Sequence, residues 1–162
     1  MKNNFLINGS YSKKINPFDR GLAFGDGIFR TFLVKNSCPI NWDMHYNKLK
    51  NDAKILQIKI PTKQQLITDI KKLFSTKKTF IGKIIITRGV SKQGYQFNKD
   101  IKNTRIVLKI VYKKINKKFL TDGVRLKVCK TRVSENSIFN GCKHLNRIDN
   151  VIAKSELKNY EF

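Results

Sequence analysis

The sequence has few acidic residues for its length. Its 162 residues include 11 Asp and Glu against 34 Lys and Arg, which gives a formal net charge of +23. Such a field attracts phosphates, nucleic acids and anionic membrane surfaces without selecting among them. The positive charge is mostly lysine and is spread along the whole chain, so we interpret it as a compositional bias. Nucleic acid is not an expected partner, because the motifs of the usual DNA- and RNA-binding modules are also missing.

Cysteine and histidine are scarce as well. Cys38, Cys129 and Cys142 are odd in number and show no CxxC or Cys/His ligand spacing, so neither a disulfide framework nor a zinc site is favoured. His45 and His144 lie too far apart in the sequence to suggest a metal site. We therefore expect a reducing, cytoplasmic setting and no bound metal.

Long hydrophobic runs are absent. The first residues, MKNNFLINGSYSKK, become polar too soon for a signal peptide, and no segment approaches the roughly 18 apolar residues of a membrane span. We expect no membrane partner. A hydrophobic content of 40% nevertheless suffices to bury the core of one ordinary domain or of two small lobes.

The first half of the chain alternates strand and helix patterns. Apolar runs predict strands at 5–7, before an Asn-Gly turn, at 28–34 and at 38–41, whereas the intervening stretch 21–27 is too rich in glycine for a stable helix. Apolar residues at helical spacing then predict a helix from Asp43, as N-cap, to Leu56. Thr62 and Gln65 form a capping-box pattern that opens a second helix, with the buried residues Leu66, Ile67, Ile70 and Phe74.

The second half returns to strands and ends in a helix. Strands are predicted at 83–87, 104–112 and 124–129, a loop at 130–142 and a helix from His144 to Lys158. Strands, two helices, strands and a terminal helix together predict an α+β fold. A lysine-rich stretch interrupts the pattern, so we expect an N-terminal lobe at 1–112, a connecting segment at 113–121 and the start of a second lobe at 122–162.

Lys143 is the residue whose context best suits chemistry. A lysine that captures a carbonyl must be held where desolvation or a neighbouring cation keeps its amine neutral and nucleophilic. This one follows Gly141, is expected to open the last helix, and has Arg147 one turn further on. A solvated surface lysine is the alternative.

Four motifs add a family resemblance. DRGLAFGDGIF at 19–29, HYNKL at 45–49, TRG at 87–89 followed by Gly94-Tyr95, and KHLNR at 143–147 together resemble the class IV aminotransferase family of fold-type IV pyridoxal-phosphate enzymes. The resemblance implies the N-terminal lobe of that fold plus the start of the larger, cofactor-binding lobe, and a homodimer. KHLNR is similar to the motif of aminodeoxychorismate lyases, which convert 4-amino-4-deoxychorismate to 4-aminobenzoate and pyruvate in folate biosynthesis.

The resemblance also implies roles for single residues. Lys143 matches the lysine that holds pyridoxal 5′-phosphate covalently and moves a substrate proton in β-elimination, while the cofactor acts as the electron sink. Lys48 stands where the family motif has an arginine that contacts the cofactor phosphate. Lysine keeps the positive charge there but loses the bidentate guanidinium fork.

Four further residues are candidates for substrate binding. Arg105 falls where related lyases carry an arginine suited to a carboxylate, and an outward-facing strand charge is its alternative role. Arg88 and Tyr95 are candidates for substrate contact or for structural turns. Thr31 lies beside Arg30, which stands where the family often has an acidic or small polar residue and which either alters the pocket or faces solvent.

Two family features have no counterpart after Lys143. The family continues into segments that supply a glutamate for the pyridine nitrogen and a hydroxyl-bearing turn for the phosphate, whereas the acidic residues present are Asp149, Glu156 and Glu161, the first two expected on an exposed helix face. The chain is therefore expected to be C-terminally truncated relative to the family and impaired. Three hypotheses remain: a lyase, a branched-chain or D-amino acid aminotransferase of the same class, and a non-catalytic remnant or partner-binding fragment.

Overall fold

The computed structural model describes residues 4–11, 14–135 and 137–157. The chain forms two compact units. The first contains Met1–Tyr112 together with Gly141–Leu145, and the second contains Lys113–Asn140 and Asn146–Phe162. Lys143 thus belongs to the first unit. The finer division into a lobe, a connecting segment and a second lobe stays a prediction.

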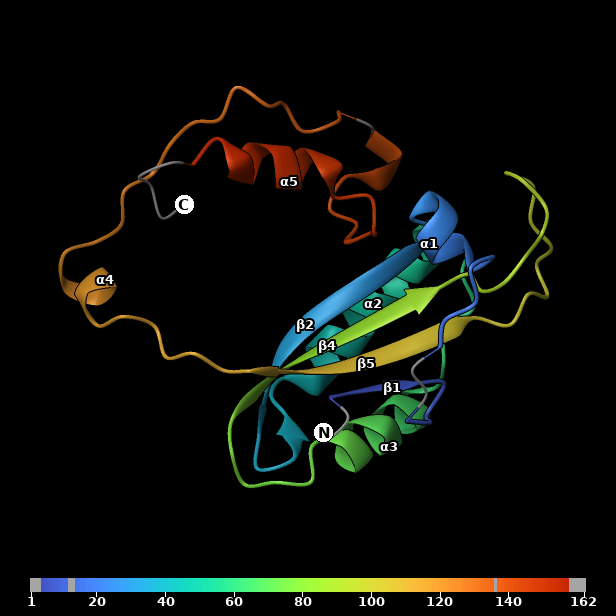
Figure 1. Cartoon of the computed structure of the whole chain (residues 1–162), viewed down its shortest axis with the longest axis horizontal. Coiled ribbons are helices and arrows are strands. Elements are labelled where there is room, and N and C mark those ends of the chain that lie inside the picture. The colour runs from blue at the N-terminus through green and yellow to red at the C-terminus, as the bar shows by residue number, and fades with distance from the viewer. Residues whose placement is uncertain (1–3, 12–13, 136, 158–162) are drawn as a thin grey trace. The chain divides into compact units, whose positions relative to one another are not determined.

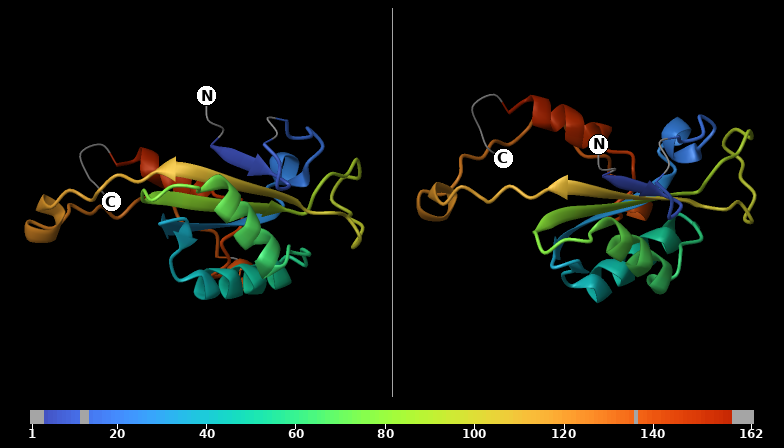
Figure 2. Two further views of the ribbon diagram at one scale, coloured as in Figure 1. Left: turned by 90° about the horizontal axis from the view of Figure 1, so that it is seen from below. Right: turned by 60° about the horizontal axis from the view of Figure 1, so that its bottom comes forward.

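A five-stranded antiparallel sheet forms the centre of the first unit, with the strand order β1-β5-β4-β2-β3. The helices α2 (Trp42–Ile55) and α3 (Lys63–Leu73) cover one of its faces, as Figures 1 and 2 show. This mixed architecture confirms the predicted α+β class. The strands are β1 (Phe5–Ile7), β2 (Gly27–Lys35), β3 (Cys38–Pro39), β4 (Phe80–Thr87) and β5 (Thr104–Val111).

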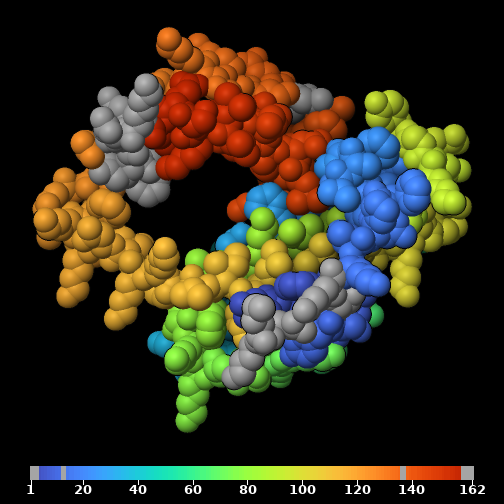
Figure 3. Space-filling view, viewed as in Figure 1, coloured from blue at the N-terminus to red at the C-terminus, as the bar shows by residue number. Residues whose placement is uncertain are grey.

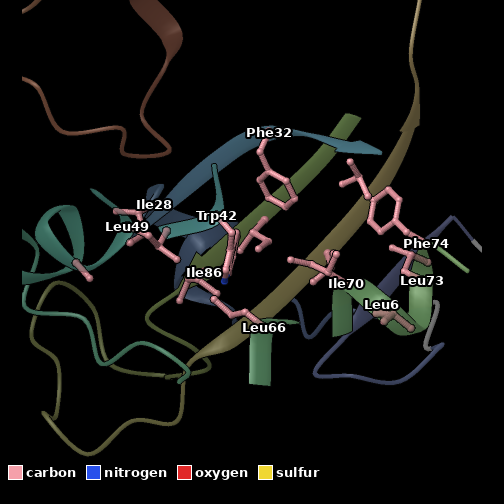
Figure 4. Close-up of a cluster of buried hydrophobic side chains, with 14 of the residues drawn as sticks. Leu6, Ile28, Phe32, Trp42, Leu49, Leu66, Ile70, Leu73, Phe74 and Ile86 are labelled. Carbon is pink, nitrogen blue, oxygen red and sulfur yellow. The ribbon is translucent and has the colours of Figure 1, made fainter. Parts of the chain in front are cut away.

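The hydrophobic core lies between this face of the sheet and the two helices (Figure 4). In β2 the buried side chains Ile28, Phe32 and Val34 follow the two-residue period of a strand, so they all point to the helices. Gly82 of β4 pairs with Phe32, and a Cβ at this glycine would lie 2.5 Å from the Phe32 ring. The glycine therefore makes room for the ring. The helices contribute Leu49, Ala53, Leu66 and Ile70 to the same core.

The helix starts agree only in part with the sequence prediction. The capping box of α3 is confirmed, since the Thr62 side chain accepts from Gln65 N and the Gln65 side chain accepts from Thr62 N. For α2 the predicted N-cap is wrong. Asn41 is the N-cap, with a left-handed φ of 52°, and Asp43 lies inside the first turn. The helix begins earlier because Trp42 packs on Phe32, with ring centroids 5.4 Å apart.

The glycine-rich stretch was wrongly predicted to be non-helical. It forms the one-turn helix α1 (Arg20–Phe24), because the Asp19 side chain accepts from Gly21 N at its start and Gly25 adopts φ 65° at its end. A left-handed residue ends a helix, and glycine adopts this conformation without strain.

The second unit is described by itself. It contains α4 (Lys118–Thr121), the short 3₁₀ helix η1 (Ser137–Phe139) and α5 (Ile148–Ser155). The strand predicted at 124–129 is wrong, because these described residues pair with no other strand. The helix predicted from His144 starts later, at Ile148, and Lys158 lies outside the described residues.

Two acidic residues of this unit hold loops in place. The Glu156 carboxylate accepts hydrogen bonds from Lys130 N, Thr131 N and Thr131 Oγ1, and Asp149 Oδ2 accepts one from Ser134 N at 3.1 Å. Asp149 lies in the first turn of α5 and Glu156 is the C-cap of that helix, so α5 positions both carboxylates to accept from the loop.

Candidate active site

The segment Gly141–Leu145 is fixed to the start of β2 by its backbone. Phe29 N donates to Lys143 O at 3.0 Å, Leu145 N donates to Gly27 O at 2.9 Å, and His144 forms an antiparallel bridge with Ile28. Lys143 therefore directly precedes a β-bridge residue and does not lie in the first turn of a helix, which corrects the sequence prediction. Gly27 permits this approach, because a Cβ there would lie 2.7 Å from Leu145 Cδ1.

The side chain of Lys143 lies against an aromatic ring of the sheet. Its Nζ is 5.0 Å from the centroid of the Phe29 ring, and Lys83 Nζ is 4.8 Å from the same centroid. Phe29 and Thr31 are two residues apart in β2, and Thr31 pairs with Lys83 of β4, so these side chains share the sheet face opposite to α2 and α3. Two amines thus lie at one aromatic ring, with an exposed hydroxyl nearby along the strand.

Asp52 belongs to α2 and lies next to this segment, on the helix-covered side of the sheet. Its side chain is 0% exposed and accepts hydrogen bonds from the Arg30 guanidinium, from Lys48 Nζ at 2.6 Å and from the Lys143 amide at 3.2 Å. Lys48 Nζ also donates to Gly141 O at 2.7 Å. Arg30 is buried and paired, so of its two predicted alternatives the solvent-facing one is wrong.

The pKa of His45 is affected by the positive charges of this region. Burial lowers the pKa of His45 below its ordinary value of 6.5, and the nearby charges of Arg30 and Lys143 lower it further. Its ring lies 5.7 Å from the Phe32 ring, centroid to centroid. His45, Arg30 and Lys143 therefore form one electrostatic neighbourhood, in which further positive charge is disfavoured.

Arg105 lies elsewhere, on the helix-covered face of the sheet. Its Nε donates to Asp69 Oδ2 of α3 at 2.6 Å, and both side chains are largely buried. This buried ion pair joins β5 to α3. The predicted role in carboxylate binding stays a prediction, for which the guanidinium would have to engage a second carboxylate beside Asp69.

Arg88 and Tyr95 belong to a third cluster, which is built around Asp26. Arg88 donates to both Asp26 carboxylate oxygens and to the carbonyls of Leu56 and Gln57. Arg20 donates to the same Asp26 and to the Tyr95 carbonyl.

The hydrogen bonds around Asp26 fix the loop that follows β4 in position. The Tyr95 side chain is exposed, and its ring lies 5.6 Å from that of Phe24. Figure 3 shows this loop against the segment that contains α1. The substrate-binding roles of Arg88 and Tyr95 stay predictions. Their hydrogen bonds give the Arg88 side chain and the Tyr95 carbonyl a structural role.

The structure thus brings together some predicted residues and separates others. Lys143 and Lys48 are joined through Gly141 and Asp52, and Thr31 lies on the same sheet face as the Lys143 contact, Phe29. Sequence reasoning missed Asp52 and Lys83. The signal for Asp52 was its spacing, four residues after Lys48 and thus on the same helix face. No signal in the sequence marked Lys83.

The residues around Lys143 fit a phosphorylated aldehyde. A primary amine can bond to a carbonyl carbon, the Phe29 ring offers an apolar surface, and Lys83 and the partly exposed Lys48 supply positive charge. Among the residues described, no group of three or more His, Cys, Asp or Glu side chains is arranged to hold a metal ion.

Comparison with known proteins gives a consistent family. The model of the class IV amino-transferase family matches residues 27–162. An aminodeoxychorismate lyase of Vibrio harveyi is 29% identical over 159 residues, which cover 98% of this chain and 58% of the lyase. A second lyase of that name, from Bacillus subtilis, is 30% identical over 98 residues, covering 55% of this chain and 33% of the lyase.

A solved structure agrees with these relatives. The 4-amino-4-deoxychorismate lyase of Pseudomonas aeruginosa has a TM-score of 0.88 and 30% identity, with 96% of this chain and 57% of that chain covered. The branched-chain amino acid aminotransferase of Escherichia coli shares the fold at a TM-score of 0.79 and 16% identity, with 99% of this chain and 58% of that chain covered.

The chain belongs to the class IV aminotransferase family. The relatives that align with most of this chain are longer than it is. The chain covers a little over half of their length, 58% in the case of the Vibrio harveyi lyase. In the described part of the chain, no helix combines the length and apolar character needed to cross a membrane.

Proposed function

We propose that the protein acts as a pyridoxal 5′-phosphate-dependent lyase that converts 4-amino-4-deoxychorismate to 4-aminobenzoate and pyruvate. The observation that carries this proposal is the position of Lys143. Its backbone is hydrogen-bonded to β2, and its amine lies on the Phe29 ring. The names and the near-complete alignment of the lyase relatives support it.

The reaction balances without an oxidant or a second substrate. The bond between the ring carbon and the ether oxygen breaks, so that the oxygen leaves with the three-carbon side chain, the ring becomes aromatic by losing a proton, and one proton is added to the released fragment to give pyruvate. Pyridoxal phosphate supplies an electron sink when it is bound. Lys143 would hold the cofactor and then carry the proton with its amine, for which its fixed backbone provides the position.

The other residues would bind and orient the two anions. We propose Thr31 and Lys83 for the substrate, because they lie on the sheet face of the Lys143 contact. Arg105, Arg88 and Tyr95 remain proposed substrate contacts. Lys48 is proposed for the cofactor phosphate. An ammonium has three donors, and two of those of Lys48 are directed at Asp52 and Gly141.

Site-selective labelling tests the cofactor role. The full chain would be mixed with pyridoxal phosphate, reduced with borohydride and digested, and the modified lysines would be located by mass spectrometry. We expect modification to concentrate on Lys143 and to disappear from that peptide in Lys143→Ala. The control, Lys59→Ala, removes an exposed lysine of the Asp100 pair and should leave Lys143 labelling unchanged. Equal labelling of many surface lysines would contradict the proposal.

Product analysis then separates the lyase from an aminotransferase. A putative branched-chain aminotransferase of Methanocaldococcus jannaschii is 27% identical over 157 residues, which keeps the second activity in view. The lyase releases 4-aminobenzoate from 4-amino-4-deoxychorismate. An aminotransferase would instead convert the cofactor to pyridoxamine phosphate when an amino acid is added, and this result without any 4-aminobenzoate would favour the second activity.

We also propose a cytoplasmic homodimer, as the family resemblance implies. Apolar side chains of β1, β4 and β5 on the face away from the helices are only half-buried, which supports a further partner surface. Light scattering of the purified chain would measure the mass, and a monomer at all concentrations would contradict this assembly.

A further inference from the structure

The Asp52 carboxylate joins a strand, a helix and the lysine-bearing segment. Arg30 comes from β2, Lys48 from α2 and the Lys143 amide from Gly141–Leu145. A buried carboxylate is costly unless charged or hydrogen-bonded partners compensate its lost hydration. Here two cations and an amide provide that compensation.

Lys48 links the Asp52 carboxylate to a second residue of the segment, Gly141. Its Nζ joins Asp52 Oδ1 at 2.6 Å and Gly141 O at 2.7 Å, although the side chain is 46% exposed. The segment is therefore held at Lys143 by Asp52 directly and at Gly141 through Lys48. Both Lys48 bonds are charge-assisted and short, and the longer bond of the Lys143 amide, at 3.2 Å, goes to a charged acceptor.

Cys142 lies between these two attachment points. It is 4% exposed, and its Sγ is 3.9 Å from the backbone oxygen of Asp52. Its neighbour Lys143 contacts the Asp52 carboxylate directly, and its neighbour Gly141 contacts it through Lys48. The accessibility of the Cys142 thiol therefore reports whether Gly141–Leu145 stays attached.

We propose that Asp52 is a positioning residue for Lys143. Its carboxylate holds the backbone of Gly141–Leu145 against α2, while the bridge to β2 holds the other side, and together they set where the Lys143 amine lies. The consequence for catalysis rests on the function proposed above. The attachment itself does not, and it can be measured without cofactor.

The first test measures thiol reactivity. In a Cys38→Ser, Cys129→Ser background, only Cys142 reacts with Ellman's reagent. Asp52→Asn keeps the size of the side chain but loses its charge. We expect the reaction rate of Cys142 to rise about tenfold or more, as the loss of a charge-assisted hydrogen bond implies. Lys48→Met, which removes the attachment at Gly141, should raise the rate by a smaller factor and serves if Asp52→Asn does not fold.

Asp69→Asn is the matched control. It also removes a buried carboxylate from an aspartate–arginine pair, but its partner is Arg105 and it makes no described contact with Gly141–Leu145. We expect its Cys142 rate to stay within about twofold of the background protein, because local opening does not follow from a distant loss of stability. An unchanged rate in Asp52→Asn, or an equal rise in Asp69→Asn, would overturn the proposal.

Labelling with pyridoxal phosphate provides a second readout that a general structural role would not move. Modification of Lys143 should fall in Asp52→Asn relative to modification of the exposed Lys59, and the ratio should be unchanged in Asp69→Asn. If Lys143 is not labelled in the unchanged protein, the proposed function fails while the thiol measurements still decide the role of Asp52.

Discussion

At the scale of single residues, His45 reports on the charge around Lys143. Its pKa is lowered by burial, then by Arg30 and then by Lys143. Since the folded-state pKa lies below 6.5, the unfolded chain binds this proton more strongly. His45 therefore costs no stability well above pH 6.5, and its protonation lowers the free energy of unfolding as the pH falls below that value.

Replacing either cation should raise the pKa of His45 toward its ordinary value. We expect this in Arg30→Met and in Lys143→Met, because each removes a positive charge that opposes protonation. An NMR titration of the imidazole proton resonances measures the change. Lys59→Met, at the exposed pair with Asp100, is the control and should leave the titration where it was. An unchanged pKa in Lys143→Met would show that the amine is not near His45.

The sequence is sufficient to predict that Arg30 is buried, but not to predict which acidic residue pairs with it. Arg30 has the parity of Ile28 and Phe32 in β2, so the alternation of the strand already placed it on the buried face. A buried arginine needs an acceptor. Which acidic residue supplies it depends on how α2 packs on β2, a tertiary contact that local spacing does not define.

At the scale of elements, Gly27 decides how closely the Lys143 segment approaches β2. Gly27→Ala should lower the free energy of unfolding by about 1 to 3 kcal/mol, the range for overfilling a tight contact. The reason is that the new Cβ would lie 2.7 Å from both Ile86 O and Leu145 Cδ1. Denaturant unfolding measures the change.

Gly94→Ala is the control for this prediction. No atom lies within 4 Å of a Cβ at Gly94, so we expect a change below about 0.5 kcal/mol. A Gly27→Ala protein as stable as Gly94→Ala would contradict the close approach of the segment.

In the second unit, Glu156 should make the 130–131 loop sensitive to acid. Hydrogen bonds from the Thr131 side chain and from Lys130 N and Thr131 N lower the pKa of Glu156 from 4.5 to about 2. Its stabilisation is present above pH 4.5 and is lost as the pH falls through about 2. A carboxyl ¹³C titration measures this pKa. In Thr131→Val, which lacks the hydroxyl, it should rise, and an unchanged value would contradict the assigned contact.

The elements themselves were predicted to different degrees. The capping box of α3 follows from two side chains three residues apart, so the sequence suffices to predict it. The strand expected at 124–129 required a partner that this apolar pattern does not specify. The start of the last helix was misplaced because pairing of Gly141–Leu145 with β2 overrides the local helical spacing.

At the scale of the whole molecule, the charge imbalance should make stability depend on salt. With a formal charge of +23, folding brings many lysines together. Raising the ionic strength from roughly 0.01 to 0.15 M shortens the Debye length from about 30 to 8 Å and should increase the free energy of unfolding. Urea unfolding at each sodium chloride concentration measures the effect. Stability that falls with salt would show that attractive ion pairs dominate.

The pairing of the Lys143 segment with β2 also has a kinetic consequence. It joins residues that are far apart in the sequence, such as Ile28 and His144, whereas the hairpin of β2 and β3 and the pairing of β4 with β5 join closer residues. Contacts between distant residues form late, since closing a long loop costs entropy before the contact repays it. We therefore expect the sheet and its helices to assemble first, and the reactive amine to arrive on a surface that is already formed.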